Sequence, residues 1–103
     1  MLLSFSMERP EYSLKITVNS RQLNRIVIDQ HYRENHSELN DQLILELVKE
    51  LNGRTYDAEA VRGDFEYFRV EPLEMNSKPY RLIFLLCIGD DFLGVVNAFR
   101  VQE

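Results

Sequence analysis

Residues 79–101 read PYRLIFLLCIGDDFLGVVNAFRV, and this stretch decides the fold. Two apolar runs, 79–88 and 92–101, flank the tight turn Gly89-Asp90-Asp91, a pattern typical of a β-hairpin. Because strand side chains alternate between the two faces of a sheet, each run divides into two sets. In the first run, one face has Tyr80, Leu82, Phe84, Leu86 and Ile88, and the other face has Arg81, Ile83, Leu85 and Cys87. In the second run, one face has Phe92, Gly94, Val96 and Ala98, and the other face has Leu93, Val95, Asn97, Phe99 and Val101. All four sets are largely apolar, so we expect both faces of this sheet to be covered.

The rest of the chain predicts one domain over residues 1–103, with residues 1–10 as an N-terminal tail. Residues 12–20 alternate in polarity and predict a half-buried strand, and residues 24–32 predict its hairpin partner. A main helix is expected over 37–53, a short helix over 57–62 and an aromatic strand over 64–70. The expected class is α+β in the order β-β-α-(short α)-β-β-β, with one main helix packed on a largely antiparallel sheet.

The main helix is predicted from five apolar residues at helical spacing: Leu43, Ile44, Leu47, Val48 and Leu51. Ser37 and Asn40 can each cap its N-terminus, because a short polar side chain accepts a first-turn N–H. Asn52-Gly53 indicates its end, since glycine readily adopts the left-handed conformation that follows a helix. Leu45 is expected to point away from the apolar arc, where it is either simply exposed or part of a contact surface.

One helix can cover only one face of the sheet, so the second apolar face needs another cover. Two arrangements remain open: the N-terminal hairpin folds back as a second layer, or a second copy of the chain provides the cover. We favour a homodimer through the sheet face or its edge, because two-fold pairing is the commonest way to bury such a surface. A different protein partner is the further alternative. Soluble monomers rarely leave an apolar patch of several hundred Å² exposed.

The composition limits the partners. The chain has 17 acidic and 12 basic residues, a net charge of −5, which argues against a dedicated nucleic-acid binder. Nine of the 12 basic residues are arginine, which suits either bidentate contacts to phosphate or surface ion pairs. Cys87 is the single cysteine and lies in an apolar run, which predicts an inert thiol in a reducing, cytoplasmic protein. No run reaches the roughly 18 apolar residues of a membrane span. We expect neither a membrane nor a cofactor.

Both histidines fall in the segment HYRENHS, residues 31–37. His31 and His36 are five residues apart, which places them on different sides of a helix or on opposite faces of a strand. Histidine pairs that bind a metal from a helix are four residues apart, and the chain has no third histidine to complete a zinc site. We therefore expect no metal site, and the segment is either a polar strand-to-helix connection or an acid–base site.

An acid–base site would combine His31 or His36 with a cation from Arg33, Arg81 or Arg100. A general base, a general acid and a cation for the phosphorane are what metal-independent RNA cleavage requires. Three further side chains are candidates for binding: Asn97, a polar residue in an apolar strand, together with Tyr32 and Tyr80.

Residues 79–101, following a helix and an aromatic strand, resemble the closing meander of small bacterial toxin RNases of the RelE/barnase-like group. The resemblance is one of topology, and no catalytic residue is carried over from it. It implies a helical part before an antiparallel sheet, a cleft lined by Arg, His or Tyr side chains, and RNA as the substrate.

Two functions follow from these observations. The first is a self-associating binding module without catalytic activity, indicated by the two-sided apolar strands and the acidic composition. The alternative is a toxin-like, metal-independent RNase. Convergence of the histidines with Arg81, Arg100 and Asn97 on one concave surface would favour the RNase, and their separation would favour the binding module.

Overall fold

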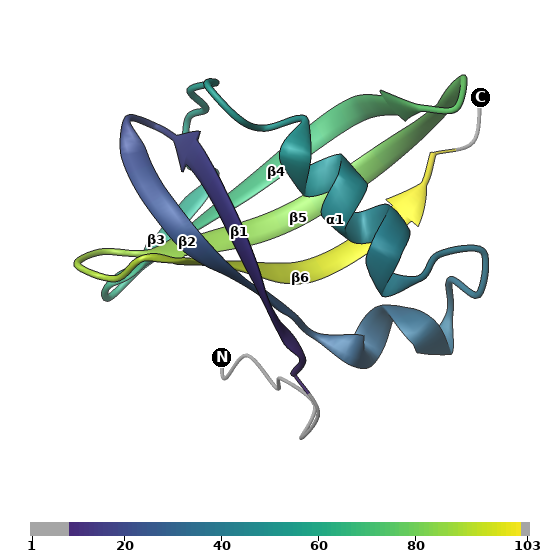
Figure 1. The fold of residues 1–103 in the computed structure, drawn as a ribbon, viewed down its shortest axis with the longest axis horizontal. Coiled ribbons are helices and arrows are strands. Elements are labelled where there is room, and N and C mark those ends of the chain that lie inside the picture. The colour runs from purple at the N-terminus through teal and green to yellow at the C-terminus, as the bar shows by residue number, and fades with distance from the viewer. Residues whose placement is uncertain (1–8, 102–103) are drawn as a thin grey trace.

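A computed structural model describes residues 9–101, which form one six-stranded sheet and one α-helix (Figure 1). The elements in chain order are β1 (Glu11–Val18), β2 (Arg21–Ile28), the 3₁₀ helix η1 (Gln30–Glu34), α1 (Asp41–Lys49), β3 (Ala60–Arg62), β4 (Phe65–Met75), β5 (Lys78–Cys87) and β6 (Phe92–Arg100). The strand order is β1-β2-β6-β5-β4-β3, and every neighbouring pair is antiparallel except β2 and β6. The α+β class and the largely antiparallel sheet are confirmed. Of the predicted tail, residues 1–10, all but Arg9 and Pro10 lie outside the described residues.

Two predicted elements are wrong. The short helix expected over 57–62 is absent, because Ala60–Arg62 forms strand β3 and pairs with the start of β4. Gly63, at a φ of 60°, and Asp64 connect the two strands in a tight turn. Six residues are also too few to offset the cost of starting an isolated helix.

The second error concerns the strand expected over 24–32, which ends at Ile28. Gln30–Glu34 forms the 3₁₀ helix η1 instead, because the Asp29 carboxylate accepts a hydrogen bond from the His31 backbone N–H at 2.7 Å. A short acidic side chain that binds its own backbone two residues ahead competes with strand pairing.

The main helix is confirmed, over a shorter range than 37–53. Asn40, rather than Ser37, is the N-cap, and its side chain accepts a hydrogen bond from the Leu43 N–H at 2.8 Å. The apolar arc faces the core, where four of its residues are fully buried: Ile44, Leu47, Val48 and Leu51. Leu45, expected to point away from this arc, is half-buried and packs against the core.

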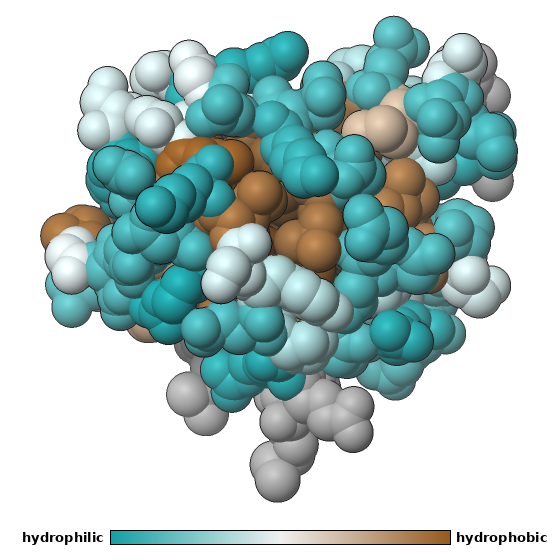
Figure 2. All heavy atoms as spheres, in the orientation of Figure 1, coloured by the Kyte–Doolittle hydropathy of each residue, from teal (hydrophilic) through white to brown (hydrophobic). Residues whose placement is uncertain are grey.

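The sheet curls so that its first hairpin lies beside α1 (Figure 1). β1 is joined to α1 near both ends of the helix: the Tyr12 hydroxyl donates to Asp41 at 2.6 Å, and the Thr17 N–H donates to Asn52 Oδ1 at 2.8 Å. The helix and the β1–β2 hairpin together therefore close the concave side of the sheet. Some apolar atoms still reach the surface between the hairpin and α1 (Figure 2).

Aromatic stacking fills the centre of the concave side. The rings of Phe68 and Phe84 stack at 4.8 Å between centroids, and Tyr56 meets Phe84 edge-on at 6.2 Å.

An ion pair of 2.5 Å joins Arg21 on β2 to Glu66 on β4. Since β6 and β5 lie between these strands in the sheet, the ion pair spans the concave side and holds the curl closed.

On the convex side of the sheet, His36 from the segment after η1 stacks on Phe99 near the end of β6, while α1 and the first hairpin both lie on the other side. One register row crosses the sheet on this side through Val27, Gly94, Leu85 and Tyr67. The buried residues of the main core come from the alternate positions of the same strands, which include Ile26, Leu93 and Leu86. The expected second apolar face therefore exists, and the N-terminal hairpin lies over the concave side with α1.

We expect Phe84→Ala to lower the free energy of unfolding by about 3–5 kcal/mol, because Phe84 is fully buried between Phe68 and Tyr56. Phe65→Ala is the matched control, since Phe65 is only half-buried on the convex side and should cost less than half as much. Urea denaturation at low micromolar protein concentration measures both. Equal losses for the two variants would contradict a core centred on Phe84.

Candidate functional site

The segment HYRENHS forms most of η1 and the connection to α1. His31 is 57% exposed at its side chain, and its Nδ1 lies 2.7 Å from the Glu34 carboxylate. Arg33 is also exposed, donates to the side-chain oxygen of Gln30 and lies 3.7 Å from Asp41. These charged groups are solvated neighbours on one short helix, an arrangement that contributes little binding energy.

Tyr32 belongs to the same segment but is buried, and its hydroxyl donates to Asp41 at 2.6 Å. The Asp41 carboxylate also accepts the Tyr12 hydroxyl at 2.6 Å and the Gln30 amide at 3.2 Å. This carboxylate therefore connects β1, η1 and the first turn of α1. The helix dipole favours its negative charge at that position.

The pKa values of this cluster follow from burial and hydrogen bonding. Burial raises the pKa of Tyr32, and its hydrogen bond to the Asp41 carboxylate raises it further. For Tyr12, the hydrogen bond to Asp41 is the main cause of a raised pKa. Burial raises the pKa of Asp41, but the hydrogen bonds from Tyr12, Tyr32 and Gln30 outweigh burial, so that its pKa is lowered. Asp41 is thus an ionised structural acceptor with satisfied partners.

His36 and Arg81 are brought together by Phe99. The His36 and Phe99 rings stack at 5.0 Å between centroids, and the Arg81 guanidinium lies 5.0 Å from the centroid of the same ring. Arg81 is held by Glu71 at 2.7 Å. Two of the five candidate catalytic residues therefore share one aromatic side chain.

Of the other candidates, Asn97 lies on the same face of β6 as Phe99, two residues before it, whereas Tyr80 and Arg100 lie on the opposite face. Tyr80 is buried in the core, while Arg100, its register partner on β6, is exposed. Asn97 faces Ile83 across the strands, and its side-chain oxygen accepts the N–H of Ala98 at 2.9 Å. Within residues 9–101, no interaction joins His31, Arg33 or Arg100 to the Phe99 contact. The same residues contain no group of three or more His, Cys, Asp or Glu side chains that could hold a metal ion.

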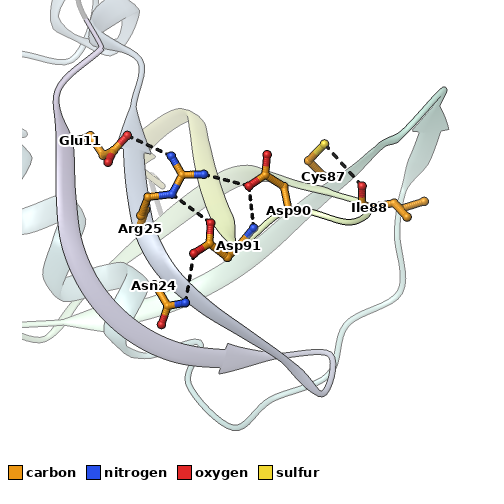
Figure 3. Close-up of polar contacts among 7 residues, drawn as sticks. All are labelled: Glu11, Asn24, Arg25, Cys87, Ile88, Asp90 and Asp91. Carbon is orange, nitrogen blue, oxygen red and sulfur yellow. Dashed lines mark hydrogen bonds and ion pairs between the residues drawn. The ribbon is translucent and has the colours of Figure 1, made fainter.

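Arg25 forms the densest polar cluster on the convex side, at its corner near β1 and β2 (Figure 3). Its guanidinium contacts Asp91 at 3.0 Å, Asp90 at 2.8 Å and Glu11 at 3.2 Å. Asp91 also accepts the Asn24 amide at 3.1 Å, and the hydrogen bonds from Asn24 and Arg25 lower its pKa. The sequence indicated Asp90 and Asp91 only as turn residues. Their contact with Arg25 depends on the parallel pairing of β2 and β6, for which no local pattern exists.

Two arginines of this convex side, Arg25 and Arg69, are each paired with carboxylates. Arg25 is 5.4 Å from the centroid of Phe92, and its carboxylate partners fix its position. Arg69, the register neighbour of Ile83, pairs with Glu59 at 2.9 Å. Arginine side chains therefore shield part of the apolar surface while their charges are neutralised nearby.

We define the outer face as the apolar residues of the convex side: Val27, Phe65, Tyr67, Ile83, Leu85, Cys87, Phe92 and Gly94. Leu85 is fully buried although it lies outside the main core cluster. A Cβ at Gly94 would lie 3.0 Å from the Leu85 Cδ1, so Leu85 lies against the glycine backbone. The other members except Gly94 are half-exposed, and they lie on four neighbouring strands.

Comparisons with protein-family models, with curated proteins and with solved structures find no significant match. No α-helix in the described part of the chain is long and apolar enough to cross a membrane. The geometry of the candidate site therefore carries the functional argument by itself.

We expect Asp41→Asn to destabilise the protein at neutral pH by about 2–3 kcal/mol, because hydrogen bonds to a charged acceptor are replaced by weaker ones. Since the pKa of Asp41 is lowered by folding, its stabilisation is present above the unfolded value of about 3.9 and is lost as the pH falls through the folded value. The stability difference between wild type and variant should therefore shrink below about pH 4.

Urea denaturation between about pH 2 and pH 7 measures this difference. Asp57→Asn is the control, since Asp57 is an exposed aspartate outside the cluster. If the difference in free energy of unfolding between wild type and Asp41→Asn stays constant over the whole pH range, the charge of Asp41 contributes nothing to stability.

Proposed function

We propose that this chain is a self-associating interaction module that binds through the outer face and has no catalytic role. The observation that carries the proposal is the set of half-exposed apolar residues on the convex side: Val27, Phe65, Tyr67, Ile83, Cys87 and Phe92. Helix α1 lies on the opposite, concave side of the sheet. Burial of such a surface contributes about 25 cal/mol per Å² removed from water, which favours association.

The composition of the outer face supports a protein partner over a nucleic acid. Phosphate binding needs arginines with free charge, but Arg25, Arg69 and Arg81 each contact carboxylates of their own chain. A chain of net charge −5 also repels a polyanion. Aromatic residues and arginines at an apolar centre with a charged rim are the usual anatomy of a protein interface.

The sheet edges are poor alternatives to the face. The C-terminal part of β1 is closed at its edge, because Thr17 donates to Asn52 Oδ1 and accepts the Gly53 N–H at 2.7 Å. β3 has only three residues. β4 is irregular between Val70 and Leu73, and it carries Pro72, which has no N–H to donate. Association through the face meets none of these obstacles.

The same proposal includes a reducing, cytoplasmic setting. It is supported by the single cysteine, which leaves the fold without an internal disulfide. Burial raises the pKa of the Cys87 thiol, which lowers its reactivity.

We expect Ile83→Glu to dissociate the dimer, because Ile83 lies on the outer face, and to weaken association at least tenfold. The neighbouring Arg69 is already paired with Glu59, so burying the new carboxylate at an interface is costly enough for such a loss. Sedimentation equilibrium over a micromolar concentration series measures the mass, and circular dichroism confirms that the variant is folded.

Val61→Glu is the matched control. Val61 is a β-branched residue of β3 that is 61% exposed, and it lies outside the outer face. This variant should keep the wild-type mass. A monomeric wild type at about 100 μM would overturn the proposal, and dissociation by Val61→Glu alone would place the contact at the β3 edge.

A further inference from the structure

We propose that two copies of the chain pack their outer faces about a two-fold axis that runs parallel to the strands, between β5 and β6. The β2–β6 half of one outer face then covers the β5–β4 half of the other. This inference rests on the proposed function, because it specifies how the same surface associates.

Sheet packing leaves two aligned arrangements. In the aligned class of sheet packing, the strands of the two sheets stay within about 30° of each other and the sheets lie roughly 10 Å apart. A two-fold axis between the faces can run along the strands or across them. If the axis runs along the strands, each half of one outer face meets the other half of the partner's face. If the axis runs across the strands, each strand meets the same strand of the partner.

Side-chain size favours the axis along the strands. In the row through the centre of the face, the β2–β6 half has small residues, Val27 and Gly94, whereas the β5–β4 half has large ones, Leu85 and Tyr67. In this row, an axis along the strands places the small residues of one copy against the large residues of the other, which allows the surfaces to fit. An axis across them opposes the large residues of both copies and leaves the small ones apart.

The turn between β5 and β6 lies beside the proposed axis, so its Asp90 and Asp91 face the same turn of the partner. Arg25 contacts these two carboxylates of its own chain, at 2.8 Å and 3.0 Å. Its positive charge offsets part of the repulsion between the two turns.

Cys87 and Ile83 give a direct geometric test, since both lie on β5 and on the outer face, one on each side of Leu85. An axis along the strands places each register row opposite the same row of the partner, so Cys87 lies close to the partner's Cys87. An axis across the strands at the row of Leu85 places the row of Cys87 opposite the partner's row of Ile83. Cys87 then lies near the partner's Ile83 and about 14 Å from the partner's Cys87, at roughly 3.4 Å of rise per residue.

The experiment uses a short thiol cross-linker on wild type and on the double variant Cys87→Ser/Ile83→Cys, alone and mixed. The reaction is run at about pH 9, because burial raises the pKa of the Cys87 thiol. We expect each protein to cross-link with its own copies, and sedimentation confirms that the double variant is still a dimer.

The outcomes separate the two proposals. Cross-links that form only in the mixture, or a dimer without any cross-link, would overturn the along-strand axis and leave self-association intact. Cys87→Ser alone is the control for reaction at other groups. A monomeric mass for wild type would overturn the proposed function, and the arrangement with it.

Discussion

The structure depends on one geometric constraint: a nine-residue helix must close one side of a six-stranded sheet. It does so because the sheet curls around it, with β1 joined to both ends of α1. The Asp41 carboxylate is central to this closure, since it receives Tyr12 from β1 and Tyr32 from η1 at the first turn of the helix. The Arg21–Glu66 ion pair acts at the opposite side of the curl, between β2 and β4.

The outer face is the consequence of that closure. Because α1 and the first hairpin both lie over the concave side, the convex side retains its apolar residues without a covering layer. Leu85 is buried against Gly94, and Arg25 lies over Phe92, so the protein shields part of this face by itself. The half-exposed remainder is the surface through which we propose that the protein associates.

The features that the sequence predicted are those encoded in local patterns. The hairpin over 79–101, the apolar arc of α1 and the two-sided character of β5 and β6 each follow from alternation or helical spacing, and each is present in the structure. The segment 57–62 was predicted as a short helix but contains strand β3. It is too short and polar for a helical or strand pattern to show, and its pairing with β4 decides its conformation. The contacts of Arg25 with Asp90 and Asp91 depend on the parallel pairing of β2 and β6, distant in sequence, and so could not be read locally. Tyr32 is a candidate site residue that is buried and bonded to Asp41. Its burial depends on the packing of η1 against the rest of the fold, which no local sequence pattern shows.

The most direct test of the account is a methyl NMR dilution series, because it reports which surface changes on association. We predict concentration-dependent shifts for the methyl groups of Val27, Ile83 and Leu85 on the outer face. The methyl groups of Leu14, Leu43 and Leu45, which pack at the concave side, should not shift. Shifts confined to the leucines of β1 and α1, or no shift of any methyl group up to about 1 mM, would contradict the claim that the outer face is the interface.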